Sequence, residues 1–258
     1  MSTVLITGAS GGIGNELAKL FARHRHNLVL VARSGDKLAQ IAPELQVHGV
    51  KVTNFALDLT APAAAQFLFD QVQSAAISVD ILVNNAGFGA WGEFAQMSNE
   101  EILGQIQLNI IALTELTRLF LPAMIARRSG RIMNVASTAG FQPGPLMAVY
   151  YATKAYVISF TEAIANELRN SGITVTCFCP GGTNTGFAQR AGNEKTRVFK
   201  QFGAMSAEKV ALDAYRAVMG GRTLAISGAH NWILAQSTRF APRKMVTAIS
   251  RWVSEQPS

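Results

Sequence analysis

Tyr150, Lys154 and Ser137 are residue types that could together transfer a proton to a carbonyl oxygen. If a helix begins near Tyr150, Tyr150 and Lys154 lie one turn apart on one face, with Cβ atoms about 5–6 Å apart. A tyrosine has an ordinary pKa of about 10, and a fixed ammonium beside it would favour the phenolate and lower that pKa. Ser137 adds a hydroxyl that can donate to the same oxygen. Because such helical pairs also arise by chance, the elements that position them decide their meaning.

Short apolar, β-branched-rich runs alternate with helical patterns along the chain. The predicted strands are Val4–Thr7, Leu28–Ala32, Val52–Leu57, Ile81–Val83, Arg131–Val135, Thr174–Cys179 and Thr223–Ser227. The predicted helices are Ile13–His24, Asp36–Val47, Ala63–Ser74, Glu100–Arg127 (bent or broken), Tyr150–Asn170 and Ala207–Met219. Near-continuous hydrophobicity in the strands indicates a parallel sheet that is covered on both faces. We expect a single-domain, doubly wound α/β fold of the Rossmann type, with a mostly parallel seven-stranded sheet and helices on both faces.

The composition is that of one large α/β domain spanning residues 1–258, because 49% of the residues are hydrophobic and no Pro/Gly/Ser-rich linker or repeat interrupts them. The chain has neither a signal-peptide pattern nor a long unbroken apolar run, so we expect no spanning helix and a cytoplasmic location. Cys177 and Cys179 lie two residues apart in a predicted strand, where their side chains share a face and would bridge poorly. We expect two buried thiols and no metal site.

The net charge of +7 is spread along the chain and does not form one basic patch. Its lysines and arginines fall into separate groups, among them Arg23/Arg25, Arg127/Arg128/Arg131 and Arg239/Arg243/Lys244/Arg251. No aromatic stacking platform accompanies them, so we expect no nucleic-acid partner. A basic surface that attracts an anionic cofactor or substrate, or keeps the protein soluble, explains the charge with fewer assumptions.

A glycine-rich turn follows the first predicted strand and opens the first predicted helix. It reads Thr7-Gly8-Ala9-Ser10-Gly11-Gly12-Ile13-Gly14, so backbone N–H groups and the helix N-terminus can receive a pyrophosphate without a Cβ in the way. Such a turn can also be merely a tight connection, but ligands of doubly wound sheets bind at the carboxyl ends of the strands, where this turn lies. We therefore expect a dinucleotide site that includes Thr7, Gly8, Ser10, Gly12, Ile13 and Gly14.

The end of the second predicted strand indicates which nicotinamide cofactor binds. Arg33 stands where an acidic residue would hold a ribose 2′-hydroxyl, and its forked guanidinium suits the 2′-phosphate of NADP(H). Ser10 and Ser34 could assist it, although Arg33 could also be a solvated loop residue. Asp58 ends the third strand, where it could accept a hydrogen bond from the adenine amino group or cap the next helix.

The order of these motifs resembles that of the short-chain dehydrogenase/reductase family, in its one-domain branch, over nearly the whole chain. The glycine-rich turn matches the family's Thr-Gly-x-x-x-Gly-x-Gly motif, and Asn84-Asn85-Ala86-Gly87 matches its Asn-Asn-Ala-Gly element. The resemblance implies that Asn85, Ala86 and Gly87 line the adenosine side of the cofactor. It also implies that Pro180, Gly181 and Thr185 contact the nicotinamide carboxamide.

The same resemblance implies a catalytic set of four residues, Asn109, Ser137, Tyr150 and Lys154. Ser137 would donate a hydrogen bond to the substrate oxygen, and Tyr150 would pass a proton to it. Lys154 would lower the pKa of Tyr150 and hold the nicotinamide ribose, while Asn109 would position a water relay to Lys154. The neighbouring Tyr151 makes the register ambiguous, and the four-residue spacing to Lys154 favours Tyr150.

Two segments are less well defined by their sequence. Residues 186–205 resemble a variable segment that covers substrate, and they contain four large side chains that could line an apolar wall or form helix core contacts: Phe187, Phe199, Phe202 and Met205. The C-terminal extension, residues 229–258, mixes large apolar residues with basic ones. It could lie on a membrane surface, cover a neighbouring subunit or pack on its own domain.

These observations predict an oxidoreductase that transfers hydride between NADP(H) and a small-molecule carbonyl or alcohol. For NADP(H), the resemblance implies reduction of a ketone or aldehyde. The alternative is a catalytically silent dinucleotide-binding sensor or interaction protein, and the intact set of Ser137, Tyr150 and Lys154 argues against it. We also expect a homo-oligomer of undefined subunit number.

Overall fold

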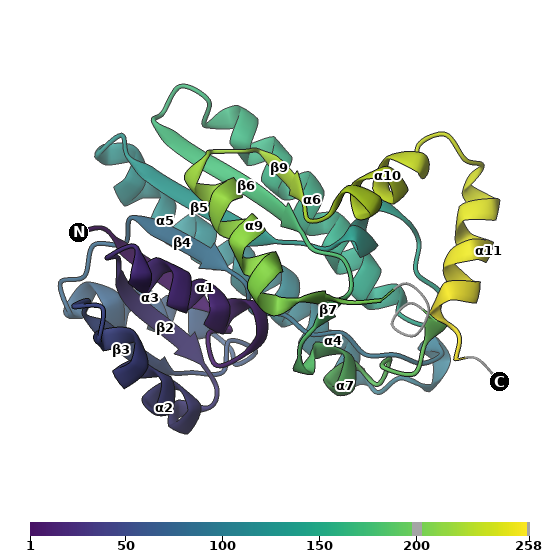
Figure 1. Cartoon of the computed structure of the whole chain (residues 1–258), viewed down its shortest axis with the longest axis horizontal. Coiled ribbons are helices and arrows are strands. Elements are labelled where there is room, and N and C mark those ends of the chain that lie inside the picture. The colour runs from purple at the N-terminus through teal and green to yellow at the C-terminus, as the bar shows by residue number, and fades with distance from the viewer. Residues whose placement is uncertain (198–202, 257–258) are drawn as a thin grey trace.

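The structure is a computed structural model, and it describes residues 1–197 and 203–256. Its central sheet contains seven parallel strands in the order β3-β2-β1-β4-β5-β6-β9 (Figure 1). The strands are β1 (Thr3–Thr7), β2 (Asn27–Ala32), β3 (Val52–Ala56), β4 (Ile81–Asn84), β5 (Gly130–Val135), β6 (Ile173–Cys179) and β9 (Leu224–Ile226). Two further strands, β7 (Thr183–Asn184) and β8 (Met205–Ser206), form a separate parallel pair that the sequence pattern does not predict.

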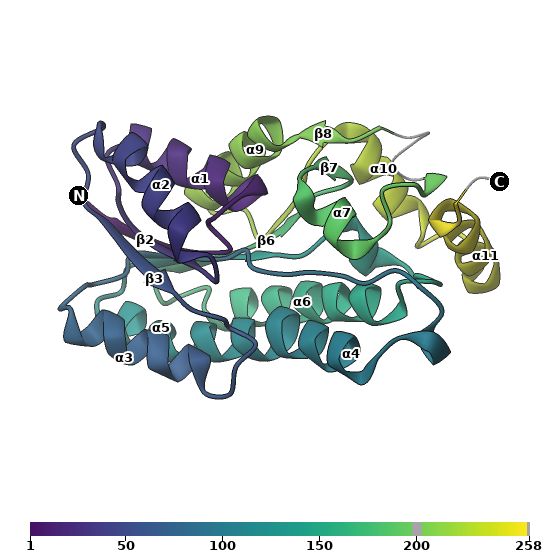
Figure 2. The same cartoon turned by 90° about the horizontal axis from the view of Figure 1, so that it is seen from below.

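Helices cover both faces of the sheet, so the predicted doubly wound α/β fold is confirmed (Figure 2). On one face lie α1 (Gly12–Arg23), α2 (Gly35–Gln46) and α9 (Ala207–Met219). On the other lie α3 (Ala64–Ser74), α4 (Asn99–Ile106), α5 (Leu113–Ala126) and α6 (Ala148–Glu167). The remaining helical segments are η1 (Phe94–Gln96), η2 (Gln107–Ala112), η3 (Thr138–Phe141), α7 (Gly186–Ala191), α10 (Ala229–Ser237) and α11 (Arg243–Ser254).

The strands are apolar on both faces because each face of the sheet has its own core. Val4 and Ile6 of β1 pack with Phe21 of α1 on one side. Leu5, which points the other way, packs with Leu116 of α5. Burying one such side chain contributes about 1.5–3 kcal/mol relative to leaving it exposed. This two-sided burial explains why the strands show no polar alternation.

The predicted helix Glu100–Arg127 is one helical stretch of three segments, α4, η2 and α5. It opens with a capping box, in which Ser98 Oγ accepts from the Glu101 N–H and the Glu101 carboxylate accepts from the Ser98 N–H. The interruption is the π-helical turn η2 and not a break. By length and composition the stretch Asn99–Ala126 could also cross a membrane, which is weak evidence because helices that cover a sheet meet the same criterion.

Candidate active site

The carboxyl ends of the central strands open onto one cavity of about 1060 Å³. It lies where the strand order reverses, between β1 and β4, which is the position at which doubly wound sheets bind ligands. The predicted site residues that line it are Gly8, Ser10, Gly12, Ile13, Arg33, Asp58, Asn85, Ala86, Gly87, Ser137, Tyr150, Lys154, Pro180, Gly181 and Thr185. Thr7, Gly14 and Asn109 are not in this lining and lie behind it.

Thr7, at the end of β1, ties the glycine-rich turn to the loop after β4. Its Oγ1 accepts hydrogen bonds from the backbone N–H groups of Asn85 and Ala86, at 3.0 and 2.9 Å. Asn85 Nδ2 donates in return to the carbonyl oxygens of Thr7 and Gly8, at 2.9 and 3.3 Å. These bonds fix the two loops side by side, so Thr7 and Asn85 shape the cavity through the backbone.

The glycines of the turn leave no room for side chains. A Cβ on Gly14 would lie 2.3 Å from the Gly8 carbonyl oxygen, and one on Gly8 would lie 2.9 Å from Ala86 Cα. Gly8 and Gly12 also have φ values of +67° and +53°, which glycine adopts at little cost. A Cβ on Gly11, in contrast, would meet nothing within 4 Å. The turn is therefore a backbone cradle at the N-terminus of α1, and it fits the diphosphate of a dinucleotide.

Arg33 and Asp58 lie beyond the cradle, after β2 and β3. Arg33 Nη1 is 3.7 Å from Asp58 Oδ2, and the two side chains are 54% and 41% exposed. Asp58 Oδ1 accepts from the Thr60 N–H at 2.9 Å, so it caps this turn and not α3. Burial would raise the pKa of Asp58, but the hydrogen bonds from Thr60 and the charge of Arg33 lower it. Arg33 lines the cavity together with Ser10 and Ser34, and it is also partly solvated.

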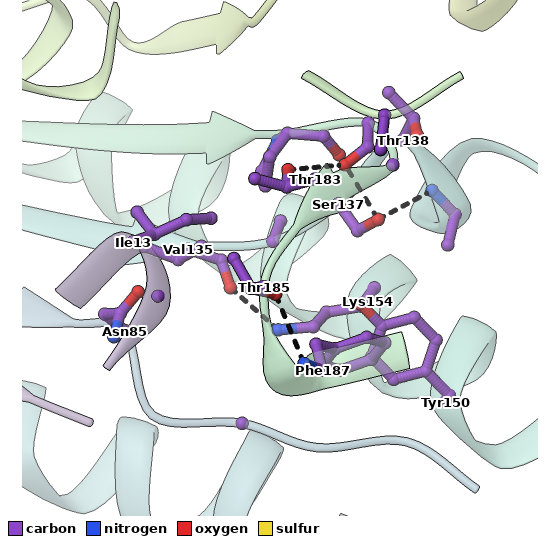
Figure 3. Close-up of a pocket in the computed structure, with 18 of the residues that line it drawn as sticks. Ile13, Asn85, Val135, Ser137, Thr138, Tyr150, Lys154, Thr183, Thr185 and Phe187 are labelled. Atoms are coloured by element: carbon purple, nitrogen blue, oxygen red, sulfur yellow. Dashed lines mark hydrogen bonds between the residues drawn. The ribbon is translucent and has the colours of Figure 1, made fainter. Parts of the chain in front are cut away.

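Ser137, Tyr150 and Lys154 line the middle of the cavity (Figure 3). Ser137 follows β5 and is the N-cap of η3, where its Oγ accepts from the Ala139 N–H at 3.1 Å. Tyr150 and Lys154 lie one turn apart in α6, as their spacing predicts, and both are buried. Lys154 Nζ donates to the Val135 carbonyl oxygen at 2.8 Å and lies 5.7 Å from the centre of the Tyr150 ring.

Burial, and not the charge of Lys154, sets the direction in which the pKa of Tyr150 shifts. Desolvation raises the pKa of Tyr150 above its ordinary value, and the hydrogen bond with Ser137 opposes this rise only in part. Desolvation also lowers the pKa of Lys154 to about 8. Both groups move toward their neutral forms because a charge is costly in a medium of low dielectric constant. The predicted net lowering of the pKa of Tyr150 is wrong for this structure, in which burial dominates and the phenol keeps its proton at neutral pH.

Asn109 lies in η2, behind the cavity. Its Nδ2 donates to the Phe88 carbonyl oxygen at 2.9 Å and to Thr153 Oγ1 at 3.1 Å. Its Oδ1 accepts from the Phe88 N–H at 3.1 Å. The side chain therefore holds the loop after β4 against α6, and its part in a water relay to Lys154 stays a prediction. Single π-helical turns are often found at functional sites.

The loop after β6 faces the glycine-rich turn across the cavity (Figure 3). Its Pro180 carbonyl oxygen accepts a long hydrogen bond of 3.4 Å from Ser137 Oγ. A Cβ on Gly181 would lie 2.4 Å from a side-chain nitrogen of α10, so this loop needs a glycine there. Thr185 caps α7, and its Cγ2 would lie 3.1 Å from a Cβ on Gly12.

Comparison with known proteins agrees with this geometry. The sequence profile of short chain dehydrogenases matches residues 2–196. The chain belongs to the short-chain dehydrogenase family. The ketoacyl reductase HetN of a Nostoc species is 39% identical over 179 residues, which are 69% of this chain and 62% of HetN. The match therefore spans less than two thirds of the length of that relative.

Two solved structures have the same fold over most of the chain. One from Sphingobium yanoikuyae, solved in complex with NADPH, is 35% identical with a TM-score of 0.84 and covers 93% of this chain and 94% of that one. The bulky-bulky ketone specific alcohol dehydrogenase from Comamonas testosteroni is 30% identical with a TM-score of 0.79 and covers 93% of this chain and 92% of that one. The predicted family is thus confirmed, and the chain is an oxidoreductase of that family.

In this short-chain dehydrogenase, the described parts of the segment 186–205, residues 186–197 and 203–205, include α7 and the start of β8, and both contribute to the cavity wall. The ring of Phe187 lies 5.2 Å from that of Tyr150, centre to centre, and Phe187 and Met205 both line the cavity. Met205 also packs against the core, so both predicted alternatives hold for it. Phe199 and Phe202 lie outside the described residues. Whether the segment covers substrate stays a prediction.

The described part of the C-terminal extension forms α10 and α11, which lie beyond the end of β9 (Figure 1). Side chains of both helices line the cavity. Leu234 of α10 and Val246 of α11 line its wall. Trp91 Nε1, in the loop after β4, donates to the Ser254 carbonyl oxygen of α11 at 2.8 Å. The described part of the extension therefore packs on its own domain, which was the plainest of the three alternatives.

Several apolar side chains of the extension are exposed, although one of them, Ile249, also lines the cavity. Phe240, between α10 and α11, is 88% exposed. Met245, Ile249 and Trp252 follow one another at helical spacing on α11 and are 48%, 54% and 47% exposed. Contact of this surface with a membrane or a second subunit stays a prediction, because the structure contains neither.

Two basic residues line the cavity although the sequence pattern did not single them out, Lys37 and Arg190. Lys37 lies in the first turn of α2, four residues after Arg33, so its proximity to Arg33 could have been noticed. Arg190 lies in α7, and its guanidinium carbon is 4.8 Å from the centre of the Phe88 ring. No spacing rule connects Arg190 with Arg33, since only the tertiary fold brings α7 over the cavity.

Proposed function

We propose that this chain is an NADP(H)-dependent carbonyl reductase that converts a small-molecule ketone or aldehyde into its alcohol. One observation carries the proposal: the glycine cradle, Arg33 and the set of Ser137, Tyr150 and Lys154 line one continuous cavity. A protein that only senses a dinucleotide needs the cradle but not a buried phenol, hydroxyl and amine beside it. The joint presence of both parts therefore favours the enzyme over the silent sensor.

The cofactor would supply the hydride that reduces the carbonyl carbon. Backbone N–H groups from Gly11 to Ile13 would hold its diphosphate, and Arg33 would hold its 2′-phosphate. Asp58, beside Arg33, would accept from the adenine amino group. The choice of NADP(H) over NAD(H) is supported by Arg33 and by the NADPH bound to the 35% identical relative from Sphingobium yanoikuyae.

Tyr150 would protonate the oxygen as negative charge develops on it. Because burial raises the pKa of Tyr150, the phenol carries the proton that reduction requires at neutral pH. The hydrogen bond that Ser137 Oγ donates to the Pro180 carbonyl oxygen is long, at 3.4 Å, so the hydroxyl could turn to donate to the substrate oxygen. Lys154, with a pKa lowered to about 8, is still mostly charged at pH 7 and would stabilise the phenolate left after proton transfer.

The substrate end of the cavity is mainly apolar. Its wall includes Met147, Phe187, Leu234, Val246 and Val253, which come from four different parts of the fold. A bulky, mostly apolar ketone would cover this wall, whereas a small hydrophilic carbonyl would leave it in contact with water. The similarity to an alcohol dehydrogenase described as specific for bulky-bulky ketones supports this choice.

A cytoplasmic homo-oligomer is the state in which we propose the enzyme works. Leu103, Ile111 and Ile125, along α4, η2 and α5, are 61%, 38% and 44% exposed, and a second copy could cover them. The two free buried thiols, Cys177 and Cys179, are typical of a reducing compartment.

The proposal is tested by following oxidation of NADPH and NADH with a panel of aldehydes, ketones, 3-oxoacyl thioesters and steroids. We expect turnover with NADPH on at least one carbonyl and a loss of at least about 100-fold in Tyr150→Phe, which lacks the transferable proton. Tyr156→Phe is the matched control, because Tyr156 lies on the exposed side of α6. Unchanged turnover in Tyr150→Phe would reject the proton donor, and binding of NADPH without turnover of any carbonyl would favour the silent sensor.

A further inference from the structure

Arg190 reaches from α7 across the cavity. α7 projects from the sheet on the same side as α1 (Figure 2), and its cap Thr185 closely approaches Gly12 of the cradle. The guanidinium carbon of Arg190 is 4.8 Å from the centre of the Phe88 ring, and Phe88 belongs to the loop after β4. The side chain thus connects α7 with a loop that borders the dinucleotide site from the other side.

Arg190 lines the same cavity as Arg33 and Asp58, the residues expected to lie at the ribose end of the site. Burial lowers the pKa of Arg190, the positive charge of Arg33 lowers it further, and Asp58 raises it. Arg33, Lys37 and Arg190 all line the cavity, and Asp58 is the one carboxylate in its lining among the described residues. The cavity lining therefore carries an excess of positive charge that Asp58 offsets only in part.

A phosphate monoester matches that excess. It carries a charge of about −1.5 to −2 near neutral pH, so one guanidinium neutralises only part of it. Arg33 Nη1 also lies 3.7 Å from Asp58 Oδ2, so part of the charge of Arg33 is already paired with a carboxylate. A second forked donor would satisfy the remaining charge of the phosphate. The bound phosphate would in turn offset the repulsion between Arg33 and Arg190.

We propose that Arg190 is a second phosphate-binding residue of the cofactor site, which acts with Arg33 on the 2′-phosphate of NADP(H). This inference rests on the proposed function, because it requires the cavity to hold a dinucleotide. The Phe88 ring keeps the guanidinium extended over the cavity through a cation–π contact, which leaves the N–H groups at its edge available to phosphate oxygens. Arg190 is thereby a specificity residue for the cofactor that lies outside the glycine-rich turn and the end of β2.

The test is calorimetric binding without substrate, for the wild type, Arg190→Ala and Arg190→Lys. The ligands are NADP⁺, NAD⁺, 2′,5′-ADP and 5′-ADP. We expect Arg190→Ala to weaken binding of NADP⁺ and 2′,5′-ADP about tenfold or more, and of NAD⁺ and 5′-ADP less than about twofold. Arg190→Lys should restore part of the loss, because it keeps the charge but not the fork. Arg169→Ala, which removes an exposed arginine after α6, should change none of the four affinities.

An equal loss for NADP⁺ and NAD⁺ in Arg190→Ala would overturn the assignment to the 2′-phosphate. Unchanged affinity for all four ligands would overturn it as well. In both cases, tight wild-type binding of NADP⁺ would leave the proposed function standing. A wild type that binds none of the four ligands would overturn the proposed function and this inference together.

Discussion

The two ends of the cavity are built from different material. The cofactor end is a backbone cradle, in which Gly8 and Gly14 allow close approach and Thr7 and Asn85 fix the loops. The substrate end is a wall of side chains from α7, α10 and α11. A backbone cradle admits few substitutions, whereas a side-chain wall can change residue by residue. Separate structures within one cavity, a backbone turn and a side-chain wall, would thus hold the cofactor and select the substrate.

The largest effect is expected from Gly14→Ala, which attacks the cradle. Its Cβ would lie 2.3 Å from the Gly8 carbonyl oxygen, a backbone atom that cannot move aside without shifting the turn. We expect a loss of unfolding free energy of roughly 3 kcal/mol and a nucleotide affinity lowered at least about tenfold. Chemical denaturation and titration of NADPH fluorescence measure the two effects.

Gly11→Ala is the matched control within the same turn. Its Cβ would meet nothing within 4 Å, so its unfolding free energy should stay within about 0.5 kcal/mol of the wild type. Equal stability of the two variants would show that the cradle tolerates side chains and would remove the contrast between the two ends.

A somewhat smaller effect is expected from Lys154→Met, at the boundary between the two ends. Burial lowers the pKa of Lys154 from its ordinary 10.5 to about 8, so the charged amine is disfavoured in the folded state. This cost is fully present below pH 8 and disappears as the pH rises toward 10.5. The variant should lose turnover and, below pH 8, gain up to about 3 kcal/mol of unfolding free energy, less the lost hydrogen bond to Val135.

Urea denaturation of the wild type and Lys154→Met between pH 7 and 10.5 would measure this gain. The advantage of the variant should shrink across that range. Lys51→Met, which replaces an exposed lysine, should show no such trend. A constant difference between wild type and Lys154→Met would contradict the lowered pKa.

The smallest of these effects is expected from Val246→Trp, which narrows the substrate wall without touching the cradle. We expect kcat/KM for a bulky ketone to fall about tenfold relative to that for a small one. Affinity for NADPH should not change. Ala248→Trp, an exposed position on the outer side of α11, is the control. An equal loss for bulky and small ketones would show that Val246 does not set substrate size.

Local sequence patterns were enough to predict the sheet and the cofactor end. The predicted strands lie close to the observed ones, because hydrophobic runs such as Val4–Thr7 define a buried strand by themselves. The glycine-rich turn was equally predictable, since its residue types and its place after β1 carry the chemistry. The π-helical turn at Asn109 was not, because its sequence is that of an ordinary apolar helix.

Properties that depend on burial or on distant contacts were not predictable. The raised pKa of Tyr150 comes from desolvation, which no spacing rule reports, so the expected lowering by Lys154 was wrong. Arg190 entered the cavity only through the placement of α7. The residues of the substrate wall follow no motif either, because any large apolar side chain at the right place would serve.

The bond between Trp91 and Ser254 joins positions 163 residues apart, so this wall of the cavity forms only after α11 has been synthesised. On the ribosome, β1 can pair with β4 and enclose the coenzyme cradle long before α11 emerges. A nascent polypeptide would therefore form the glycine-rich turn and its sheet before the wall that α11 contributes.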